Sequence, residues 1–368
     1  MKQLIVLFFL LFASQYIYSQ TRDTIRFETI FGLIKIPVVI NGNVHYFLFD
    51  TGSEPTVLRN DISGGLKKSF FRRRLIFDSH NKFAIQPIYT VPSFRIGNSE
   101  LTNLRMISFK NSQFFNCMGV EGILGIDVIK KFDWIIDFDK KYLIKLEPGD
   151  TLTDLAGFLP VEFYAKGNRP RIKLKIGDKW LDFLFDSGAS TNDITKKDAR
   201  DLEKVNLKSY DQISSSYGLL SLTTPSKEAL FIVNAEMNEQ STARHKMSLS
   251  TISAGENKIG NAFWGKNRMY LSWEKQKLLF GNSIPVVEES FGIGFGLNND
   301  TTYVLSLVST EQISKSGIKA GDLIKTINGK TYHNNCDLLL FMGLPKGNEM
   351  TIETTDGRII TLQKQSLF

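Results

Sequence analysis

Two stretches of the chain carry nearly the same motif. Residues 47–58 read FLFDTGSEPTVL and residues 183–194 read FLFDSGASTNDI, so Asp50 and Asp186 lie 186 − 50 = 136 residues apart. A single Asp-(Thr/Ser)-Gly tripeptide usually marks only a turn at the end of a strand. A repeat of the whole FLFD(T/S)G run instead indicates a duplicated unit.

The segments before both aspartates repeat as well. In each copy three apolar residues alternate along the chain and a turn signal follows. They are Ile36, Val38 and Ile40 before Asn41-Gly42, and Ile172, Leu174 and Ile176 before Gly177-Asp178. Alternation with a period of two around a turn predicts a β-hairpin, and the second strand of each hairpin ends at the aspartate.

The segments after the aspartates also correspond, over residues 121–146 and 257–280. In both, an apolar residue precedes a glycine, Gly125 or Gly260, and a short helical stretch and a hairpin follow. The sequence therefore predicts a mainly β protein with two homologous lobes, residues 21–155 and residues 156–283.

The paired motifs resemble the catalytic loops of the pepsin-like and retropepsin-like aspartic proteases. The resemblance covers about residues 25–283, and the paired motif is specific to this family. It implies that the two lobes form one cleft with Asp50 and Asp186 as the catalytic pair. It also implies that the hydroxyls of Thr51 and Ser187 reach across to the opposite loop. The other residues that it places in or under the loops are Gly52, Ser53, Gly188, Ala189, Ile123, Leu124 and Gly125.

Paired carboxylates suit peptide hydrolysis for a physical reason. Two carboxylates a few ångströms apart share one proton, so one can act as general base on a water while the other donates to the scissile carbonyl. We expect no metal or cofactor and a monomer, because one chain supplies both halves. Since Ser53 has a hydroxyl that Ala189 lacks, we expect Asp50 to ionise more readily and Asp186 to carry the shared proton.

The expected substrate is an extended polypeptide, bound under a flap hairpin. Residues 77–90 are the flap candidate, because residues 78–81 carry a turn signal. Tyr89 within this segment is either a flap tyrosine or, as we expect, a core residue.

The second lobe departs from the family pattern behind its active loop. Lys258, which we align with Leu124, interrupts the apolar segment, and Ala262 stands where the first lobe has Asp127. Asn267 likewise replaces Phe132. An exported aspartic endopeptidase is our main interpretation. The departures leave open a catalytically inactive peptide-binding scaffold or adaptor of the cell envelope.

The character of the chain changes after Pro285. Residues 314–330, SKSGIKAGDLIKTINGK, resemble the core of a PDZ domain, a resemblance that covers roughly residues 286–368. It implies a small α+β domain that pairs a peptide or a C-terminus with a strand edge. The candidate peptide-binding residues are Phe291, Gly292, Ile293, Gly294 and Phe295. A Gly-rich phosphate loop is the rival reading of this run, but no Lys-(Ser/Thr) follows it. The domain either binds substrate or partner peptides or stabilises the second lobe.

The N-terminus indicates export. Lys2 and an apolar run over residues 4–13 predict a signal peptide over residues 1–20 and a periplasmic or extracellular protein, with an uncleaved anchor as the alternative. The net charge of +7 would suit nucleic acid, but export argues against that partner. We interpret the basic cluster at residues 67–74 as a solvated face, with contact to an anionic envelope surface as the alternative.

The cysteines and histidines carry less information. Cys117 and Cys336 fall in different predicted domains, so we expect two buried free thiols and no disulfide. The four histidines are far apart in sequence, which gives no zinc-site spacing.

Overall fold

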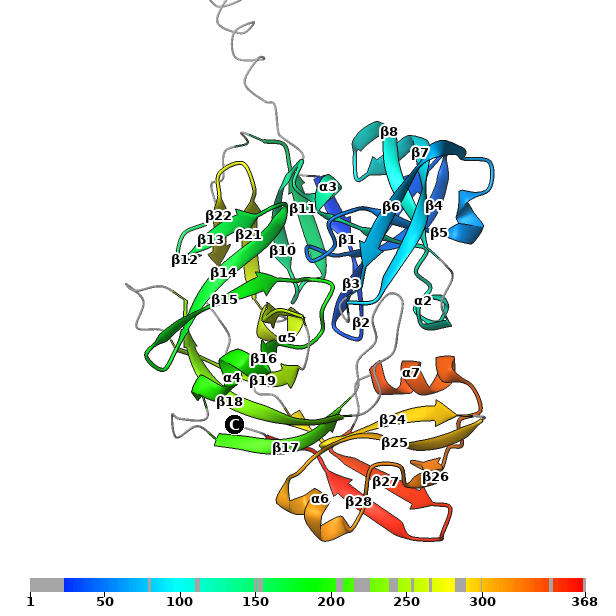
Figure 1. The fold of residues 1–368 in the computed structure, drawn as a ribbon, viewed down its shortest axis with the longest axis vertical. Coiled ribbons are helices and arrows are strands. Elements are labelled where there is room, and N and C mark those ends of the chain that lie inside the picture. The colour runs from blue at the N-terminus through cyan, green and yellow to red at the C-terminus, as the bar shows by residue number, and fades with distance from the viewer. Residues whose placement is uncertain are drawn as a thin grey trace, which may run out of the picture.

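The computed structural model describes most of the chain beyond residue 22 (Figure 1). The described residues are 23–78, 81–109, 113–148, 150, 155–202, 208–214, 226–237, 244–252, 255–264, 267–281, 289–298, 300–343 and 347–366. The expected signal peptide, residues 1–20, lies outside them. Within the described residues, no helix has the length and apolar character needed to cross a membrane.

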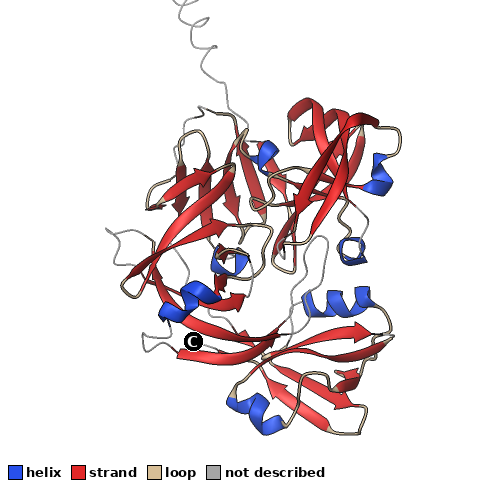
Figure 2. Cartoon of the chain, viewed as in Figure 1, coloured by secondary structure: helices blue, strands red, loops and turns tan. Residues whose placement is uncertain are grey.

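The predicted mainly β fold is confirmed, and Figure 2 shows that strands dominate every part of the molecule. We call residues 23–148 the first lobe. Its elements are β1 (Asp23–Arg26), β2 (Glu28–Ile30), β3 (Leu33–Ile40), β4 (Asn43–Phe49), β5 (Val57–Arg59), η1 (Asn60–Ser63), β6 (Lys67–Phe77), β7 (Phe83–Ile96), β8 (Ser99–Phe109), α2 (Gln113–Cys117), β9 (Gly122–Leu124), α3 (Ile126–Ile129), β10 (Asp133–Asp137) and β11 (Tyr142–Leu146).

We call residues 155–281 the second lobe, and it repeats this order. Its elements are β12 (Leu159–Val161), β13 (Phe163–Lys166), β14 (Arg169–Ile176), β15 (Lys179–Phe185), β16 (Asp193–Thr195), α4 (Lys196–Leu202), β17 (Lys208–Ser214), β18 (Ser226–Glu236), β19 (Arg244–Ile252), β20 (Lys258–Ile259), α5 (Asn261–Trp264), β21 (Arg268–Ser272) and β22 (Lys277–Phe280).

The two predicted hairpins end at the two aspartates. Strands β3 and β4 pair around Asn41-Gly42, and β14 and β15 pair around Gly177. Asn41, Gly42 and Gly177 all have positive φ, which Asn and Gly tolerate best. The alternating apolar residues of β3 and β14 are buried, as their period of two predicts.

A six-stranded sheet joins the lobes, in the order β1-β11-β10-β21-β22-β12. Its centre is the antiparallel pair β10 and β21, in which Ile135 lies opposite Tyr270. The separation of that pair, 270 − 135 = 135, equals that of Gly125 and Gly260, 260 − 125 = 135. Equivalent residues therefore face each other there, which places a local two-fold axis between the lobes.

One apolar core runs through both lobes and supports both aspartate loops. Phe49 contacts Trp134 edge-on with ring centroids 5.1 Å apart, and Phe185 packs on Trp264 at 4.1 Å. All four of these side chains are fully buried. Burying an aromatic side chain of this size stabilises a fold by roughly 1.5–3 kcal/mol, so the residue before each aspartate is firmly anchored.

We call residues 289–366 the C-terminal unit, which lies below the two lobes in Figure 1. Its elements are β23 (Glu289–Ser290), β24 (Ile293–Asn298), β25 (Thr301–Val308), α6 (Glu311–Ser316), β26 (Leu323–Ile327), α7 (Asn335–Gly343), β27 (Glu349–Thr354), β28 (Ile359–Gln363) and β29 (Gln365–Ser366). The unit has an apolar core of its own. Helix α6 follows the N-cap Thr310 and ends before Gly317, which has a φ of 68°.

The C-terminal unit is joined to both lobes. Strand β25 pairs antiparallel with β17, so one sheet runs from the second lobe into the unit. On the other side, Cys336 of α7 forms a disulfide with Cys117 of α2 in the first lobe. The prediction of two free thiols was therefore wrong. Assignment to different domains does not separate two cysteines in space, and here the helices lie side by side with the Cα atoms 4.8 Å apart.

The disulfide predicts sensitivity to reduction. Removing a native disulfide typically costs 2–5 kcal/mol of stability, so dithiothreitol should lower the denaturation midpoint of the oxidised protein. The Cys117→Ser/Cys336→Ser variant should have that lower midpoint with and without the reductant. A wild-type midpoint that is unchanged by complete reduction would contradict a stabilising cross-link.

Candidate active site

The two aspartate loops have the same backbone frame. The amide of Asp50 donates to the carbonyl of Leu124 on β9, and that of Asp186 donates to the carbonyl of Ile259 on β20, both at 3.0 Å. Strand β9 runs parallel to β4, and β20 runs parallel to β15. Leu124 is fully buried beneath its loop. Each aspartate is therefore held at the end of a strand by the apolar-Gly segment that follows it in the same lobe.

The glycines after these strands allow that close packing. A Cβ atom at Gly125 would overlap the backbone at Pro55 and Thr56, and one at Gly260 would overlap the carbonyls of Ala189 and Thr191. Only glycine fits at either position without moving the active loop.

The two loops are locked together by reciprocal hydrogen bonds. The Thr51 hydroxyl donates to the Phe185 carbonyl at 2.7 Å and accepts from the Ser187 amide at 2.9 Å. The Ser187 hydroxyl donates to the Phe49 carbonyl at 2.7 Å and accepts from the Thr51 amide at 3.0 Å. Thr51 and Ser187 are both fully buried. The expected reach of each hydroxyl into the opposite loop is present.

The carboxyl groups meet beneath the backbone of the opposite glycine. A Cβ atom at Gly52 would overlap the carboxyl group of Asp186, and one at Gly188 would overlap that of Asp50. The amides of these glycines donate to the carboxylate of their own loop, at 2.8 Å for Asp50 Oδ1 and 2.9 Å for Asp186 Oδ1. The absence of a side chain at both glycines lets the two acids approach each other.

The environment of Asp50 favours its protonated form. Desolvation by the surrounding protein, together with the charge of Asp186 and a hydrogen bond between the two side chains, raises the pKa of Asp50 to about 8. The amides of Gly52 and Ser53 oppose this rise only in part. The expectation that Asp50 is the more readily ionised member loses its premise, because the Ser53 hydroxyl donates to the Pro55 carbonyl at 2.9 Å and not to Asp50.

The second lobe supports its loop with different side chains. In the first lobe Thr56 Oγ1 donates to Asp127 at 2.6 Å and accepts from the Gly125 amide at 3.1 Å. In the second lobe the single side chain of Asn192 accepts from the Gly260 amide at 3.1 Å and donates to a β19 carbonyl. Asn192 therefore holds the segment at Gly260 in place although Ala262 replaces Asp127.

Sequence reasoning missed Asn192 and Asn261. Asn192 lies six residues after Asp186, as Thr56 lies six after Asp50, so alignment of the repeats could have found it. Asn261 aligns with the apolar Ile126 and gave no signal. Its amide donates to the Ser187 carbonyl at 2.9 Å and to the Gly32 carbonyl at 2.7 Å, which ties the second loop to the turn between β2 and β3.

Lys258 does not occupy the position that we expected. In the strand pairing Lys258 lies opposite Leu184, and Ile123 lies opposite Leu48 in the first lobe. The alignment of Lys258 with Leu124 was therefore wrong by one residue, because Ile259 is the buried residue that precedes Gly260. The apolar-Gly step is thus intact in the second lobe.

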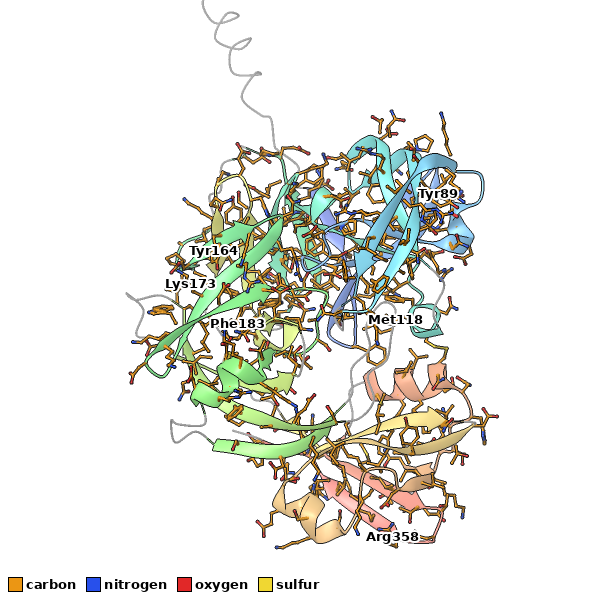
Figure 3. All side chains as sticks on the ribbon, in the orientation of Figure 1. Tyr89, Met118, Tyr164, Lys173, Phe183 and Arg358 are labelled. Carbon is orange, nitrogen blue, oxygen red and sulfur yellow. A yellow bond between two sulfur atoms is a disulfide. The ribbon has the colours of Figure 1, made fainter. Side chains whose placement is uncertain are left out.

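The flap candidate forms the hairpin of β6 and β7, and Ser79 and His80 of its turn lie outside the described residues. Arg74 of this hairpin forms an ion pair with Glu54, four residues beyond Asp50, at 3.3 Å. Tyr89, labelled in Figure 3, packs half-buried against the main core, in keeping with a core tyrosine. Four large apolar side chains near the hairpin tip are exposed, namely Leu75, Phe77, Phe83 and Ile85.

The structure places the other candidate residues, 291–295, away from the aspartates. They lie in β24 and the turn before it, and Phe291 and Phe295 belong to the core of the C-terminal unit. Among the described residues, no group of three or more histidines, cysteines or acids is arranged to hold a metal ion.

Comparison with known proteins agrees with the geometry of the first loop. Residues 36–128, about a quarter of the chain, match a family model described as aspartyl protease. The matched segment contains Asp50, its loop and the Ile123-Leu124-Gly125 segment, and it supports a protease function. No curated protein matches the chain.

The cross-lobe hydrogen bonds predict different effects for two substitutions of Thr51. Thr51→Val keeps the shape but leaves the Phe185 carbonyl and the Ser187 amide unpaired in a buried place, at roughly 1–3 kcal/mol for each group. Thr51→Ser keeps the hydroxyl and should cost much less. Urea denaturation of both variants measures the difference. Equal loss in both would show that the methyl group, and not the hydroxyl, matters.

The raised pKa of Asp50 predicts that stability falls as the pH rises from about 4 to about 8. In this window Asp50 is protonated when folded and ionised when unfolded, so unfolding releases a proton. One such group contributes at most about 1.4 kcal/mol per pH unit. Asp50→Asn should flatten the pH dependence of the urea midpoint, whereas Asp178→Asn, in an exposed turn, should not. Equal slopes in wild type and Asp50→Asn would refute the raised pKa.

Proposed function

We propose that the protein is an exported aspartic endopeptidase in which Asp50 and Asp186 activate a water molecule. The observation that carries the proposal is the meeting of two carboxyl groups, each against the glycine of the opposite loop, on loops that a duplicated fold locks together. The aspartyl protease match over residues 36–128 supports the first of these loops.

The reaction uses both protonation states at once. The ionised carboxylate takes a proton from water as the water oxygen attacks the carbonyl carbon of the peptide bond. The protonated carboxyl gives its proton to the carbonyl oxygen. When the tetrahedral intermediate collapses, the C–N bond breaks and the leaving nitrogen takes the proton from the carboxyl group that deprotonated the water. A hydroxyl of the intermediate gives its proton to the other carboxylate as it becomes the carbonyl of the new carboxyl group. The pair is then ready to share one proton again.

The substrate is an extended polypeptide between the lobes, covered by the hairpin of β6 and β7. The ion pair between Arg74 and Glu54 supports this, because it holds the hairpin beside the first aspartate loop. The exposed apolar side chains of the hairpin supply surface for substrate side chains, since apolar contact drives such binding. The chain acts as a monomer, because both aspartates come from one polypeptide.

The C-terminal unit acts as a PDZ-like peptide-binding domain. Among the described strands, β24 pairs only with β25, so its other edge is open to an added strand. That edge faces α7, where the Phe295 amide lies 3.5 Å from the sulfur of Met342. The two aromatic residues Phe291 and Phe295 anchor the segment in the core and leave its backbone to bind the peptide.

Export is supported by the disulfide between Cys117 and Cys336. Disulfides form and persist in oxidising compartments such as the periplasm or the extracellular space. The basic, apolar and polar segments of residues 1–20 supply the matching signal peptide.

Cleavage of a mixed peptide library from about pH 4 to pH 8 tests the proposal. Removing an acid or base typically costs 10²–10⁴-fold in rate, so Asp50→Asn and Asp186→Asn should each lose at least about 100-fold, while Asp178→Asn should keep full activity. Supplying each peptide with a free or an amidated C-terminus also tests the PDZ-like domain, which should favour the free carboxylate.

Two outcomes would contradict the proposal in different ways. Undiminished cleavage by either aspartate variant would exclude the pair as the catalyst. Wild-type protein that binds peptides without cleaving them at any pH would instead favour the inactive scaffold.

A further inference from the structure

One pair of facing residues beside the aspartate loops is apolar in the first lobe and charged in the second. In the first lobe Val57 on β5 lies opposite Ile123 on β9, and both are buried in an apolar cluster. At the equivalent place in the second lobe Asp193 on β16 lies opposite Lys258 on β20. An apolar pair has thus been replaced by an ion pair within an otherwise equivalent backbone frame.

The ion pair is well formed and poorly exposed. Lys258 Nζ lies 2.9 Å from Asp193 Oδ2, with the side chains only 18% and 10% exposed. The Thr191 hydroxyl donates to the other oxygen of Asp193 at 3.2 Å. Burying two charges carries a large desolvation cost, and replacing such a pair by apolar residues is often neutral or stabilising. Packing alone therefore gives no reason for a lysine here, since the first lobe uses isoleucine.

The position of Lys258 gives a functional reason. Lys258 lies opposite Leu184, two residues before Asp186, and the next residue accepts the backbone hydrogen bond of Asp186. Burial lowers the pKa of Lys258, but attraction to Asp193, then to Asp186 and least to Asp50, raises it above its usual value. The backbone pairing therefore anchors Lys258 beside the loop of Asp186, in the second lobe.

The acids that act on the Lys258 ammonium are Asp193 from β16, Asp186 from the loop after β15 and Asp50 from the first lobe. On the far side of Asp193, the paired residue of β19 is Ser250, which does not titrate in this range.

We propose that Lys258 fixes the roles within the aspartate pair: its ammonium keeps Asp186 ionised as the general base and leaves the shared proton on Asp50 as the general acid. This inference rests on the proposed function. Lys258 acts through Asp186 and does not touch the substrate, so it is a positioning residue. Asp193 holds the ammonium in place and, by its own negative charge, weakens its effect on Asp186.

The proposal predicts opposite shifts for the two partners of the ion pair. The acidic limb of the kcat/KM profile reports ionisation of the base in the free enzyme. Lys258→Met removes a positive charge and should move this limb to higher pH, by about one unit. Asp193→Asn removes a negative charge and should move the limb to lower pH, because Lys258 stays cationic at acidic pH.

A double variant guards against misfolding. Asp193→Val/Lys258→Ile copies the apolar pair Val57 and Ile123. The equivalent strands of the first lobe already hold that pair, so we expect the double variant to fold. Its acidic limb should lie between those of the two single variants, and above that of Asp193→Asn even if Lys258→Met does not fold. Lys275→Met is the matched control, because Lys275 pairs with the buried Asp133 at 2.9 Å in the six-stranded sheet. It should leave the limb unmoved.

The failure of this inference is distinguishable from the failure of the proposed function. If Asp50→Asn and Asp186→Asn abolish cleavage but Lys258→Met and Asp193→Asn shift the limb in the same direction or not at all, only the role of Lys258 is refuted. A shift in Lys275→Met equal to that in Lys258→Met would also refute it. Cleavage that survives loss of either aspartate refutes the proposed function itself.

Discussion

The structure depends on the four hydrogen bonds that Thr51 and Ser187 exchange across the lobe boundary. Each hydroxyl both donates to a carbonyl and accepts from an amide of the opposite loop, so two hydroxyls, two carbonyls and two amides are all satisfied where both side chains are fully buried. An unpaired polar group there would be costly, which fixes the distance between the loops within narrow limits. Gly52 and Gly188 follow Thr51 and Ser187, and because they have no side chains the two carboxyl groups can approach each other.

The two lobes share a backbone arrangement but differ in the side chains around the two aspartates. The duplicated strands and the local two-fold at Ile135 and Tyr270 place the two carboxyl groups in equivalent positions. Two acids in equivalent positions can share one proton, but the backbone alone does not decide which of them holds it. The side chains around them differ between the lobes, most clearly at Lys258 and Asp193, while the backbone frame stays the same.

Much of the fold could be read from the sequence because its signals are local. The period of two in Ile36, Val38 and Ile40 and the turn at Asn41-Gly42 depend only on neighbours along the chain. The match between Gly125 and Gly260 is visible because the chain repeats itself. The reach of Thr51 and Ser187 followed from family resemblance. The disulfide, the hydroxyl partner of Ser53 and the tie from Asn261 to Gly32 depend on how distant segments meet, and residue types alone do not encode that.

The alignment of Lys258 was wrong by a single residue. A shift of one residue reverses which side of a strand a residue faces. Counting back from Gly125 and Gly260 aligns Lys258 with Ile123, and the backbone pairing of Lys258 with Leu184 has the same register. The partner of the Ser53 hydroxyl was likewise misjudged, because that hydroxyl donates to the Pro55 carbonyl and not to Asp50.

The cross-link between Cys117 and Cys336 also changes the covalent topology of the chain. It closes a ring across 219 residues that contains Asp186, while Asp50 lies on the arm outside the ring. A single backbone cut anywhere within the ring, including the connection between the lobes, leaves two pieces that remain covalently bound. Each aspartate then still has its partner at a high effective concentration. The fold would in this way tolerate one cut between the two cysteines without losing either of its paired aspartates.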